Sequence, residues 1–258
     1  MTIDELQQKK AMGQKISMLT CYDYAMAKIL SRAGVDMLLV GDSLGMVVLG
    51  YSSTRDVTMD DMVRHTAAVA RGAAGPVIVG DMPYGSYENP GQALDNAKRL
   101  LDAGAHMIKV ERGREIRDVI TALVQTGIPV MGHLGLTPQT AENFRVQGRE
   151  TAAAMVLRED ALLLSELGVH SMVLESMPRS LAKEITLSLR IPTIGIGAGP
   201  DTDGQVLVLY DMLGLFDDFR PKFVKPYADL STAIESAVRQ YAREVAEGIF
   251  PDDTTSFT

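Results

Sequence analysis

The sequence has no tryptophan and a single cysteine, Cys21, among its 258 residues. One cysteine excludes an intrachain disulfide framework and is typical of a reducing compartment, so we expect a cytoplasmic protein with Cys21 as a small core residue. No apolar run reaches the roughly 18 residues that a transmembrane helix needs. The N-terminal segment MTIDELQQKK also lacks the apolar centre of a signal peptide. We therefore expect no export and no membrane partner.

Basic residues are in short supply as well. The chain holds 25 lysines and arginines against 33 acidic residues, a formal charge of −8, and it has no dense basic tract. Such a chain is a poor candidate for binding nucleic acid, because the phosphate backbone is bound mainly through positive charge. With 46% hydrophobic and 22% charged residues, the composition is that of an ordinary globular protein and excludes a disordered or collagen-like chain.

What the sequence does contain is a series of short apolar runs that mostly lack polar alternation. This pattern is typical of strands buried on both faces of a parallel sheet. The predicted strands are 16–19, 37–40, 77–79, 107–110, 129–131, 172–174, 193–196 and, more weakly, 222–224.

Segments with helical spacing lie between these runs, and five of them end at a glycine. Glycine directly after the last periodic residue is a common helix stop, because it adopts positive φ without a Cβ clash. These predicted helices cover 24–33, 59–71, 90–103, 115–126 and 151–167, and a further one covers 231–247 near the end of the chain.

Eight strands alternating with helices predict a (β/α)8 barrel that forms a single domain over residues 1–258. The alternative is an open, doubly wound sheet, but its glycine-rich fingerprint is missing after the first strand. The GIGAG segment at 195–199 comes late in the chain, and Pro200 stands where the third fingerprint glycine would be.

Polar residues follow the predicted strands at the end where barrel enzymes carry their active sites. Four carboxylates, a lysine, a histidine and a serine are expected to meet there: Asp42, Asp81, Glu111, Glu175, Lys109, His133 and Ser43. Any single acid in such a place can instead be a helix N-cap. Four together would repel one another unless a cation or a proton compensates, and oxygen ligands point to Mg²⁺. Histidine and cysteine spacing for zinc is absent.

Lys109 and Glu111 are two residues apart on one strand, so both side chains lie on the same face. If that face is the barrel interior, Lys109 meets an anionic group of the substrate while Glu111 stays near the metal. An internal ion pair without a catalytic role is the alternative. His133, which follows Gly132, is equally compatible with a catalytic role and with a hydrogen-bonded structural role.

The segments at the strand ends, taken in order, resemble one known family. They are LLVGDSLGMVVLG (38–50), GDMPYGSY (80–87), MIKVE (107–111), GHLGLTPQ (132–139), VLES (173–176) and IPTIGIGAG (191–199). On these motifs the chain resembles ketopantoate hydroxymethyltransferase, and the resemblance covers nearly all of the sequence.

The resemblance implies a barrel of the phosphoenolpyruvate/pyruvate group of Mg²⁺ enzymes. It implies transfer of a hydroxymethyl group from 5,10-methylenetetrahydrofolate to 3-methyl-2-oxobutanoate, through a Mg²⁺-stabilised enolate. The products are ketopantoate and tetrahydrofolate, in pantothenate and coenzyme A biosynthesis. Members of this family are cytoplasmic homo-oligomers, typically decamers, so the same assembly is expected here.

The resemblance also assigns roles to the strand-end residues. Asp42 and Asp81 match metal ligands that also contact the substrate, and Glu111 matches a metal-site glutamate. Ser43 and Lys109 match substrate contacts, and Glu175 matches the general base. His133 is expected to contact the metal ligands without binding the metal itself.

One segment departs from the family pattern, and three other functions remain open. The stretch AENFRVQGRE (141–150) is shorter than the glycine-rich, lysine-containing stretch usual in the family, so the cover over the active site is expected to differ. The first alternative is another Mg²⁺-dependent 2-oxo-acid enzyme, such as a carbon–carbon lyase or a phosphoenolpyruvate mutase relative, although the cysteine loop of the lyases is absent. The others are a barrel that has lost catalysis and a phosphosugar enzyme that uses GIGAG as a phosphate cradle at a helix start.

Overall fold

The structure is a computed structural model, and it describes residues 1–141, 145–216 and 221–257. Its internal contacts divide the chain into two units, Met1–Val208 and Leu209–Thr258. Each unit is described here by itself.

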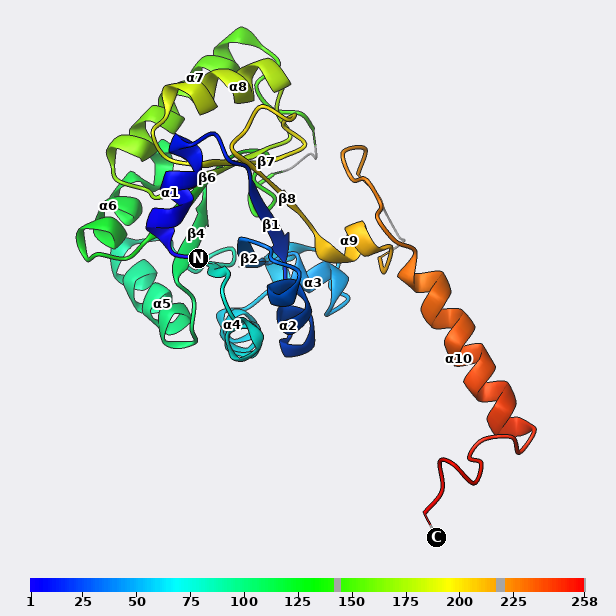
Figure 1. The fold of residues 1–258 in the computed structure, drawn as a ribbon. Coiled ribbons are helices and arrows are strands. Elements are labelled where there is room, and N and C mark those ends of the chain that lie inside the picture. The colour runs from blue at the N-terminus through cyan, green and yellow to red at the C-terminus, as the bar shows by residue number, and fades with distance from the viewer. Residues whose placement is uncertain (142–144, 217–220, 258) are drawn as a thin grey trace. The chain divides into compact units, whose positions relative to one another are not determined.

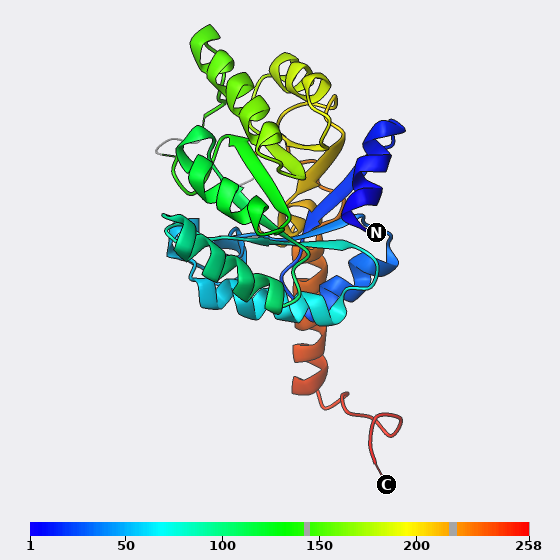
Figure 2. The same ribbon diagram turned by 90° about the vertical axis from the view of Figure 1, so that its left-hand side faces the viewer.

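The first unit is a closed barrel of eight parallel strands in sequence order, with helices around the outside (Figures 1 and 2). Every neighbouring pair is parallel, and β8 closes the barrel against β1. The (β/α)8 prediction is therefore confirmed. The strands are β1 (Ile16–Thr20), β2 (Met37–Val40), β3 (Val77–Asp81), β4 (Met107–Glu111), β5 (Val130–Gly135), β6 (Ser171–Glu175), β7 (Thr193–Ile196) and β8 (Gly204–Leu207).

The five helices predicted from glycine stops are all present. For example, α5 has Pro90 in its first turn, the Asn89 side chain accepts a hydrogen bond from the Gln92 amide, and Gly104 follows its end with φ 105°. Within the first unit, the helical segments are α1 (Ile3–Ala11), α2 (Tyr24–Arg32), α3 (Leu44–Val47), η1 (Thr54–Asp56), α4 (Met59–Gly72), α5 (Pro90–Asp102), η2 (Arg114–Ile116), α6 (Arg117–Gln125), α7 (Thr151–Glu166) and α8 (Arg179–Ser188).

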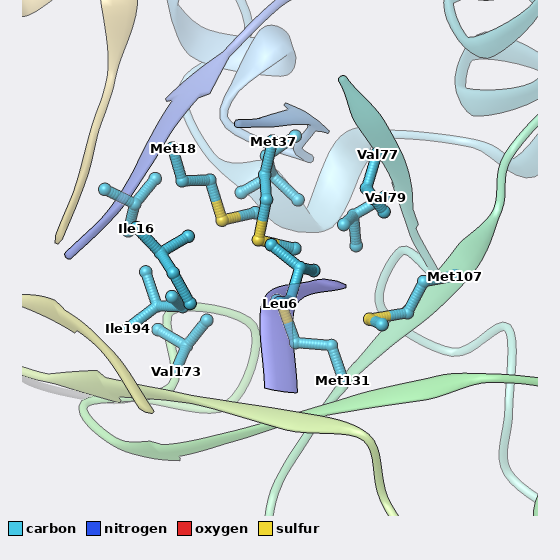
Figure 3. Packing of buried hydrophobic residues seen from close by; sticks show 12 residues of the cluster. Leu6, Ile16, Met18, Met37, Val77, Val79, Met107, Met131, Val173 and Ile194 are labelled. Carbon is cyan, nitrogen blue, oxygen red and sulfur yellow. The ribbon is translucent and has the colours of Figure 1, made fainter. Parts of the chain in front are cut away.

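Helix α1 was not predicted, because only one of its side chains is buried and it has no apolar stripe. A capping box between Thr2 and Glu5 begins the helix. Lys9 and Lys10 then fix it to the barrel through Asp36 and Asp203, at 2.6 and 2.7 Å. Its single buried side chain, Leu6, enters the apolar interior (Figure 3).

The interior at the N-terminal ends of the strands is filled by a cluster of buried apolar side chains (Figure 3). Four of the fifteen methionines, one each from β1, β2, β4 and β5, take part in it. Flexible thioether side chains fill such a tapered space well. Below the site, the barrel is therefore a packed core and not a channel. The cluster consists of Leu6, Ile16, Met18, Met37, Leu39, Val77, Val79, Met107, Met131, Val173, Ile194 and Val206.

A repeated hydrogen bond secures the same end of the barrel. The residue directly before each even-numbered strand accepts a backbone N–H from the preceding odd-numbered strand. These acceptors are Asp36, His106, His170 and Asp203. For the two histidines the acceptor is Nδ1, at 3.0 Å from the Ile78 nitrogen and 3.4 Å from the Val130 nitrogen. A ring nitrogen accepts only when it is unprotonated, so both bonds need a neutral imidazole.

Stability is expected to fall between about pH 7 and pH 5. Burial lowers the pKa of both His106 and His170 below the ordinary value near 6.5. In that range the unfolded chain binds protons that the folded chain does not, so acid favours unfolding. Urea titrations at several pH values should show a smaller slope for His106→Gln/His170→Gln, which removes both titrating groups. An unchanged slope would contradict this assignment.

The eighth strand was predicted wrongly. Residues 222–224 form no strand, and β8 instead covers Gly204–Leu207, inside the segment DGQVLVL. The error arose because the connection between β7 and β8 contains no helix, so the alternation of strands and helices breaks there. Residues 195–199 cover the end of β7 and the start of the loop that leads to β8. The helix start that a phosphate cradle would use does not follow them.

The second unit contains α9 (Leu209–Leu213) and α10 (Leu230–Ala246). Helix α10 confirms the prediction for 231–247 to within a residue at each end. None of its residues is buried, although it carries Ile234, Val238, Tyr241 and Val245 at helical spacing. Among the described helices, none combines the length and apolar character needed to cross a bilayer.

Candidate active site

The inward-facing positions of β3 and β4 change from apolar to charged along each strand. On β3, Val79 is followed two residues later by Asp81, and on β4, Met107 is followed by Lys109 and Glu111. Because side chains alternate between the two faces of a strand, these residues point into the barrel together. The charged groups thus lie above the apolar cluster, at the C-terminal ends of the strands.

Strand register brings the charged groups into contact. Asp81 is paired with Lys109 across β3 and β4, and Glu111 is paired with His133 across β4 and β5. Lys109 Nζ donates to both oxygens of Asp81, at 2.9 and 2.8 Å, and to Glu111 Oε1 at 3.1 Å. The structure therefore contains the internal ion pair that the sequence left open as an alternative, and it lies within the predicted site.

The lysine remains charged in spite of its burial. Burial lowers the pKa of Lys109, but Asp81 and Glu111 raise it by more, and the result is well above the ordinary value. Burial likewise raises the pKa of Asp81 against the opposing effect of Lys109. A buried network of this kind is costly to desolvate and stabilises the fold little, so its placement at the mouth of the barrel favours a role in binding.

His133 links two carboxylates. Its Nδ1 lies 3.1 Å from Glu111 Oε1, and its Nε2 lies 3.3 Å from Glu175 Oε2. The second contact is not aligned as a hydrogen bond, and the buried Nε2 has no other partner among the described residues. Burial lowers the pKa of His133, but Glu111 raises it by more, to about 9, so the ring is a cation at neutral pH. Glu111 has its pKa lowered to about 2, because Lys109 and His133 outweigh the effect of burial.

Glu175 differs from the other carboxylates in its exposure. It is the last residue of β6, and its side chain is 16% exposed, compared with 1% for Asp81 and for Glu111. Its neighbour across the ladder is Gly135, where a Cβ would lie 2.1 Å from the Glu175 carbonyl oxygen. Glycine at 135 therefore allows β5 to approach β6 closely at Glu175. Of this group of carboxylates, Glu175 is the one best placed to meet a substrate.

Asp42 completes the cluster from the loop after β2. Its backbone nitrogen donates to Asp81 Oδ2 at 3.4 Å, and its carboxylate accepts from Gln139 Nε2 at 3.0 Å. Burial raises the pKa of Asp42 well above its ordinary value, and the charges of Asp81 and Glu111 add to the effect. The site thus has more carboxylates than the lysine can neutralise, which favours binding of a cation.

Within the described residues, Ser43 contacts Tyr22 and none of the carboxylates of this network. Its hydroxyl lies 2.9 Å from the Tyr22 hydroxyl, and its place beside Asp42 in the chain brings it near the mouth. Tyr22 in turn accepts a contact from His65, whose Nδ1 lies 2.6 Å from the Tyr22 carbonyl oxygen. Cys21 is fully buried, and burial raises the pKa of its thiol to about 12, so it is a core residue as predicted.

Two buried residues of the site escaped the sequence analysis. Gln139 and Tyr87 lie in the loops after β5 and β3, and Tyr87 donates its hydroxyl proton to Gln139 Oε1 at 2.6 Å. Both residues lie inside the family motifs GHLGLTPQ and GDMPYGSY, which was the one available signal. In the shortened stretch 141–150, Arg145 and Arg149 are exposed, while 142–144 lie outside the described residues.

Arg112 adds a strained backbone at the end of β4. Its φ is 91°, a region that non-glycine residues rarely adopt, and its guanidinium lies 5.4 Å from the centre of the Tyr87 ring. Its Nε is buried and has no hydrogen bond within the described residues. Strain of this kind gathers at functional sites, which agrees with the position of Arg112 directly after Glu111.

Carboxylate oxygens are suitable ligands for Mg²⁺, but the predicted ligands Asp42, Asp81 and Glu111 are not all placed to bind one ion. Across the described ranges, no three histidine, cysteine or acidic side chains are close enough to hold an ion as they stand. Lys109 lies between Asp81 and Glu111, and both Glu111 oxygens accept hydrogen bonds. Mg²⁺ commonly binds through one or two carboxylates and completes its shell with water and substrate oxygens. Asp42 fits that pattern through Oδ1, which accepts no hydrogen bond in the described part of the chain, whereas Asp81 would have to share oxygens that already accept from Lys109.

Comparison with known proteins agrees with this architecture. The sequence profile described as Ketopantoate hydroxymethyltransferase matches residues 1–253. A protein named 3-methyl-2-oxobutanoate hydroxymethyltransferase from Syntrophus aciditrophicus is 54% identical, over 99% of this chain and 96% of its own length. One of the same name from Moorella thermoacetica is 53% identical, over 99% and 97%.

Solved structures with little sequence identity share the fold. A phosphonopyruvate hydrolase in complex with oxalate and Mg²⁺ has a TM-score of 0.65 at 14% identity, covering 100% of this chain and 92% of its own. A 2,3-dimethylmalate lyase, described as a member of the PEP mutase/isocitrate lyase superfamily, has a TM-score of 0.61 at 15% identity, covering 99% and 91%. These structures show the fold alone, whereas the profile match over residues 1–253 and the relatives that are 53–54% identical show that the chain belongs to the ketopantoate hydroxymethyltransferase family of enzymes.

Proposed function

We propose that this chain transfers a hydroxymethyl group from 5,10-methylenetetrahydrofolate to 3-methyl-2-oxobutanoate, giving ketopantoate and tetrahydrofolate. The observation that carries the proposal is the cluster of carboxylates, lysine and imidazolium at the C-terminal end of the barrel. It combines excess negative charge for a cation with positive groups for an anionic 2-oxo acid. The cluster occurs in a chain more than half identical to enzymes named for this reaction.

Substrate binding divides between the two sides of the cluster. Asp42 and Asp81 would hold Mg²⁺, which when bound supplies a Lewis acid for the carboxylate and keto oxygens of the 2-oxo acid. Lys109 carries a positive charge that its neighbours stabilise, and it would attract the substrate carboxylate. Ser43 would contact the same group from the loop after β2. Glu111 would act mainly by orienting Lys109 and His133, which it contacts directly.

Proton abstraction is assigned to Glu175. Its carboxylate is partly exposed at the mouth and would take the proton from C3 of the 2-oxo acid. His133, whose Nε2 lies 3.3 Å from Glu175 Oε2, would hold this carboxylate in position. The carbanion equivalent at C3 would then form a bond to the methylene carbon, and one water molecule would supply the hydroxyl oxygen. Both bonds from that carbon to the folate nitrogens would break, and tetrahydrofolate would leave with the two protons, one from C3 and one from the water.

The direct test is tetrahydrofolate release in the presence of both substrates and Mg²⁺. Release is expected to need all three components and to stop when a chelator is added. Absence of release under these conditions would contradict the reaction, whereas release that survives the chelator would contradict the metal. Inorganic phosphate should compete poorly with 3-methyl-2-oxobutanoate, as expected for a site without a phosphate cradle.

Asp42→Ala is expected to weaken Mg²⁺-dependent binding of 3-methyl-2-oxobutanoate by roughly 100-fold or more. Loss of residues behind the ligands typically costs about 10–100-fold, and loss of a ligand should cost more. Calorimetric titration of the 2-oxo acid at several Mg²⁺ concentrations measures the effect. Asp60→Ala, at an exposed aspartate of α4, is the control. Identical Mg²⁺ dependence in both variants would exclude Asp42 as a ligand.

We also propose that the protein is a cytoplasmic homo-oligomer, as in its family, with the whole chain forming one functional domain. Helix α10 supports an assembly, because its apolar residues are 47–59% exposed in the described chain: Ile234, Val238, Tyr241 and Val245. Continuous apolar patches of this kind commonly mark protein interfaces. Light scattering of the purified protein tests the decamer, and a monomer would contradict it.

A further inference from the structure

Gln139 contacts two carboxylates of the cluster, Glu111 and Asp42, although the sequence analysis gave it no role. We propose that Gln139 is a positioning residue that holds the Asp42 carboxylate in place for a divalent cation. The inference rests on the proposed function, in that it takes Asp42 to be a metal ligand. It assigns to Gln139 no contact with substrate or metal.

Every polar atom of Gln139 is used. The side chain is fully buried, and the backbone nitrogen donates to Glu111 Oε2 at 3.1 Å. Its carbonyl oxygen accepts from Arg55 Nε at 2.8 Å, so the backbone is held from both sides. A buried residue with this many bonds has one conformation, and its side chain is therefore a fixed reference for whatever it contacts.

The direction of the side-chain amide follows from the donors and acceptors around it. The Glu111 backbone nitrogen donates to the Tyr87 hydroxyl at 3.3 Å, and that hydroxyl therefore directs its own proton to Gln139 Oε1, 2.6 Å away. The other end of the amide must then be the NH₂ group. It faces the Met82 carbonyl oxygen at 2.9 Å, which can only accept, and Asp42 Oδ2 at 3.0 Å. The chain of bonds has one possible polarity.

The Gln139 amide therefore fixes one oxygen of the Asp42 carboxylate. Oδ2 accepts from Gln139, whereas Oδ1 accepts no hydrogen bond from the described part of the chain. A ligand held in this way binds a metal ion more tightly, because the protein has already oriented it.

A purely structural role is the alternative, since Gln139 also joins the loops after β2, β3 and β5. The two roles differ in what the loss of the amide changes. If the role is purely structural, loss of the amide lowers the free energy of unfolding and leaves the metal affinity of the folded protein unchanged. A positioning residue changes that affinity even where the fold is intact.

The experiment compares Gln139→Met with Gln92→Met, using Mn²⁺ alone as the probe. Methionine keeps the length of glutamine and removes its hydrogen bonds. Gln92 is a matched control, because its side chain also donates to a backbone carbonyl and accepts from a backbone N–H, at Gly85 and Glu88, without touching a carboxylate. Electron paramagnetic resonance counts free Mn²⁺, and urea titration measures stability. We expect a 10–100-fold weaker Mn²⁺ affinity for Gln139→Met and less than a twofold change for Gln92→Met.

Tyr87→Phe is the second variant, in case Gln139→Met fails to fold. It removes the proton that orients the amide, so a smaller loss of Mn²⁺ affinity, about 3–10-fold, is expected. Unchanged Mn²⁺ affinity in folded Gln139→Met or Tyr87→Phe would overturn the positioning role and leave the proposed function intact. Failure of the unaltered protein to bind Mn²⁺ would overturn the metal site and this inference with it, which separates the two failures.

Discussion

Glu175→Gln is expected to abolish exchange of the C3 proton of 3-methyl-2-oxobutanoate with deuterium in solvent. It should also lower kcat by about 10²–10⁴-fold, the range that a positioned general base contributes. Glutamine has nearly the same shape and cannot accept the proton. Glu175 contacts His133 and not the Lys109 network, so binding of the 2-oxo acid should change little. Proton nuclear magnetic resonance follows the exchange, and calorimetry follows the binding.

The control for this variant is Glu184→Gln. Glu184 lies on α8, is about half exposed and pairs with Arg158, away from the strand ends. Exchange and turnover in this variant should equal those of the unaltered protein. Exchange that persists in Glu175→Gln would exclude Glu175 as the base. Loss of exchange together with loss of binding would show that the side chain holds the substrate and would also contradict the assignment.

The sequence predicted most of the barrel, because its strands and helix ends carry local signals. The run Met37–Val40 matches β2 without error, and Gly34 and Gly104 mark helix ends through their positive φ. The eighth strand was misplaced where the local rule fails, between β7 and β8, since their connection lacks the expected helix. Helix α1 was missed for the opposite reason. It is held by Lys9 and Lys10 through ion pairs that leave no periodic signal in the sequence.

The sequence predicted several members of the carboxylate cluster, but not which of its groups form hydrogen bonds with one another. Placement at strand ends identified Asp81, Lys109 and Glu111, because alternation along a strand fixes which side chains share a face. Which group bonds to which depends on the stagger between neighbouring strands, a relation among residues 22 to 28 positions apart. Gln139 could not be found in this way, since it acts from an irregular loop and its partners come from three separate segments.

Because Lys109 pairs with two buried carboxylates, its loss should affect stability more than the loss of any other residue of this network. Lys109→Met keeps much of the side-chain volume and leaves Asp81 and Glu111 buried without their common cation. Removing one member of a buried ion pair typically costs about 3–5 kcal/mol, because the remaining charge is uncompensated. Urea titration at pH 7 should show a loss of that order, and binding of 3-methyl-2-oxobutanoate should be lost as well. Lys98→Met, at an exposed position of α5, should have no comparable effect.

Two further measurements separate lost charge from lost packing. Burial already raises the pKa of Asp81, and without Lys109 it should rise further, so the folded variant binds protons more tightly than the unfolded chain. Its deficit in stability should therefore shrink as the pH falls from 7 towards 5. Mg²⁺ should also raise the melting temperature of the variant more than that of the unaltered protein, because the cation replaces the missing positive charge. A deficit independent of both pH and Mg²⁺ would mean that Lys109 matters for packing alone.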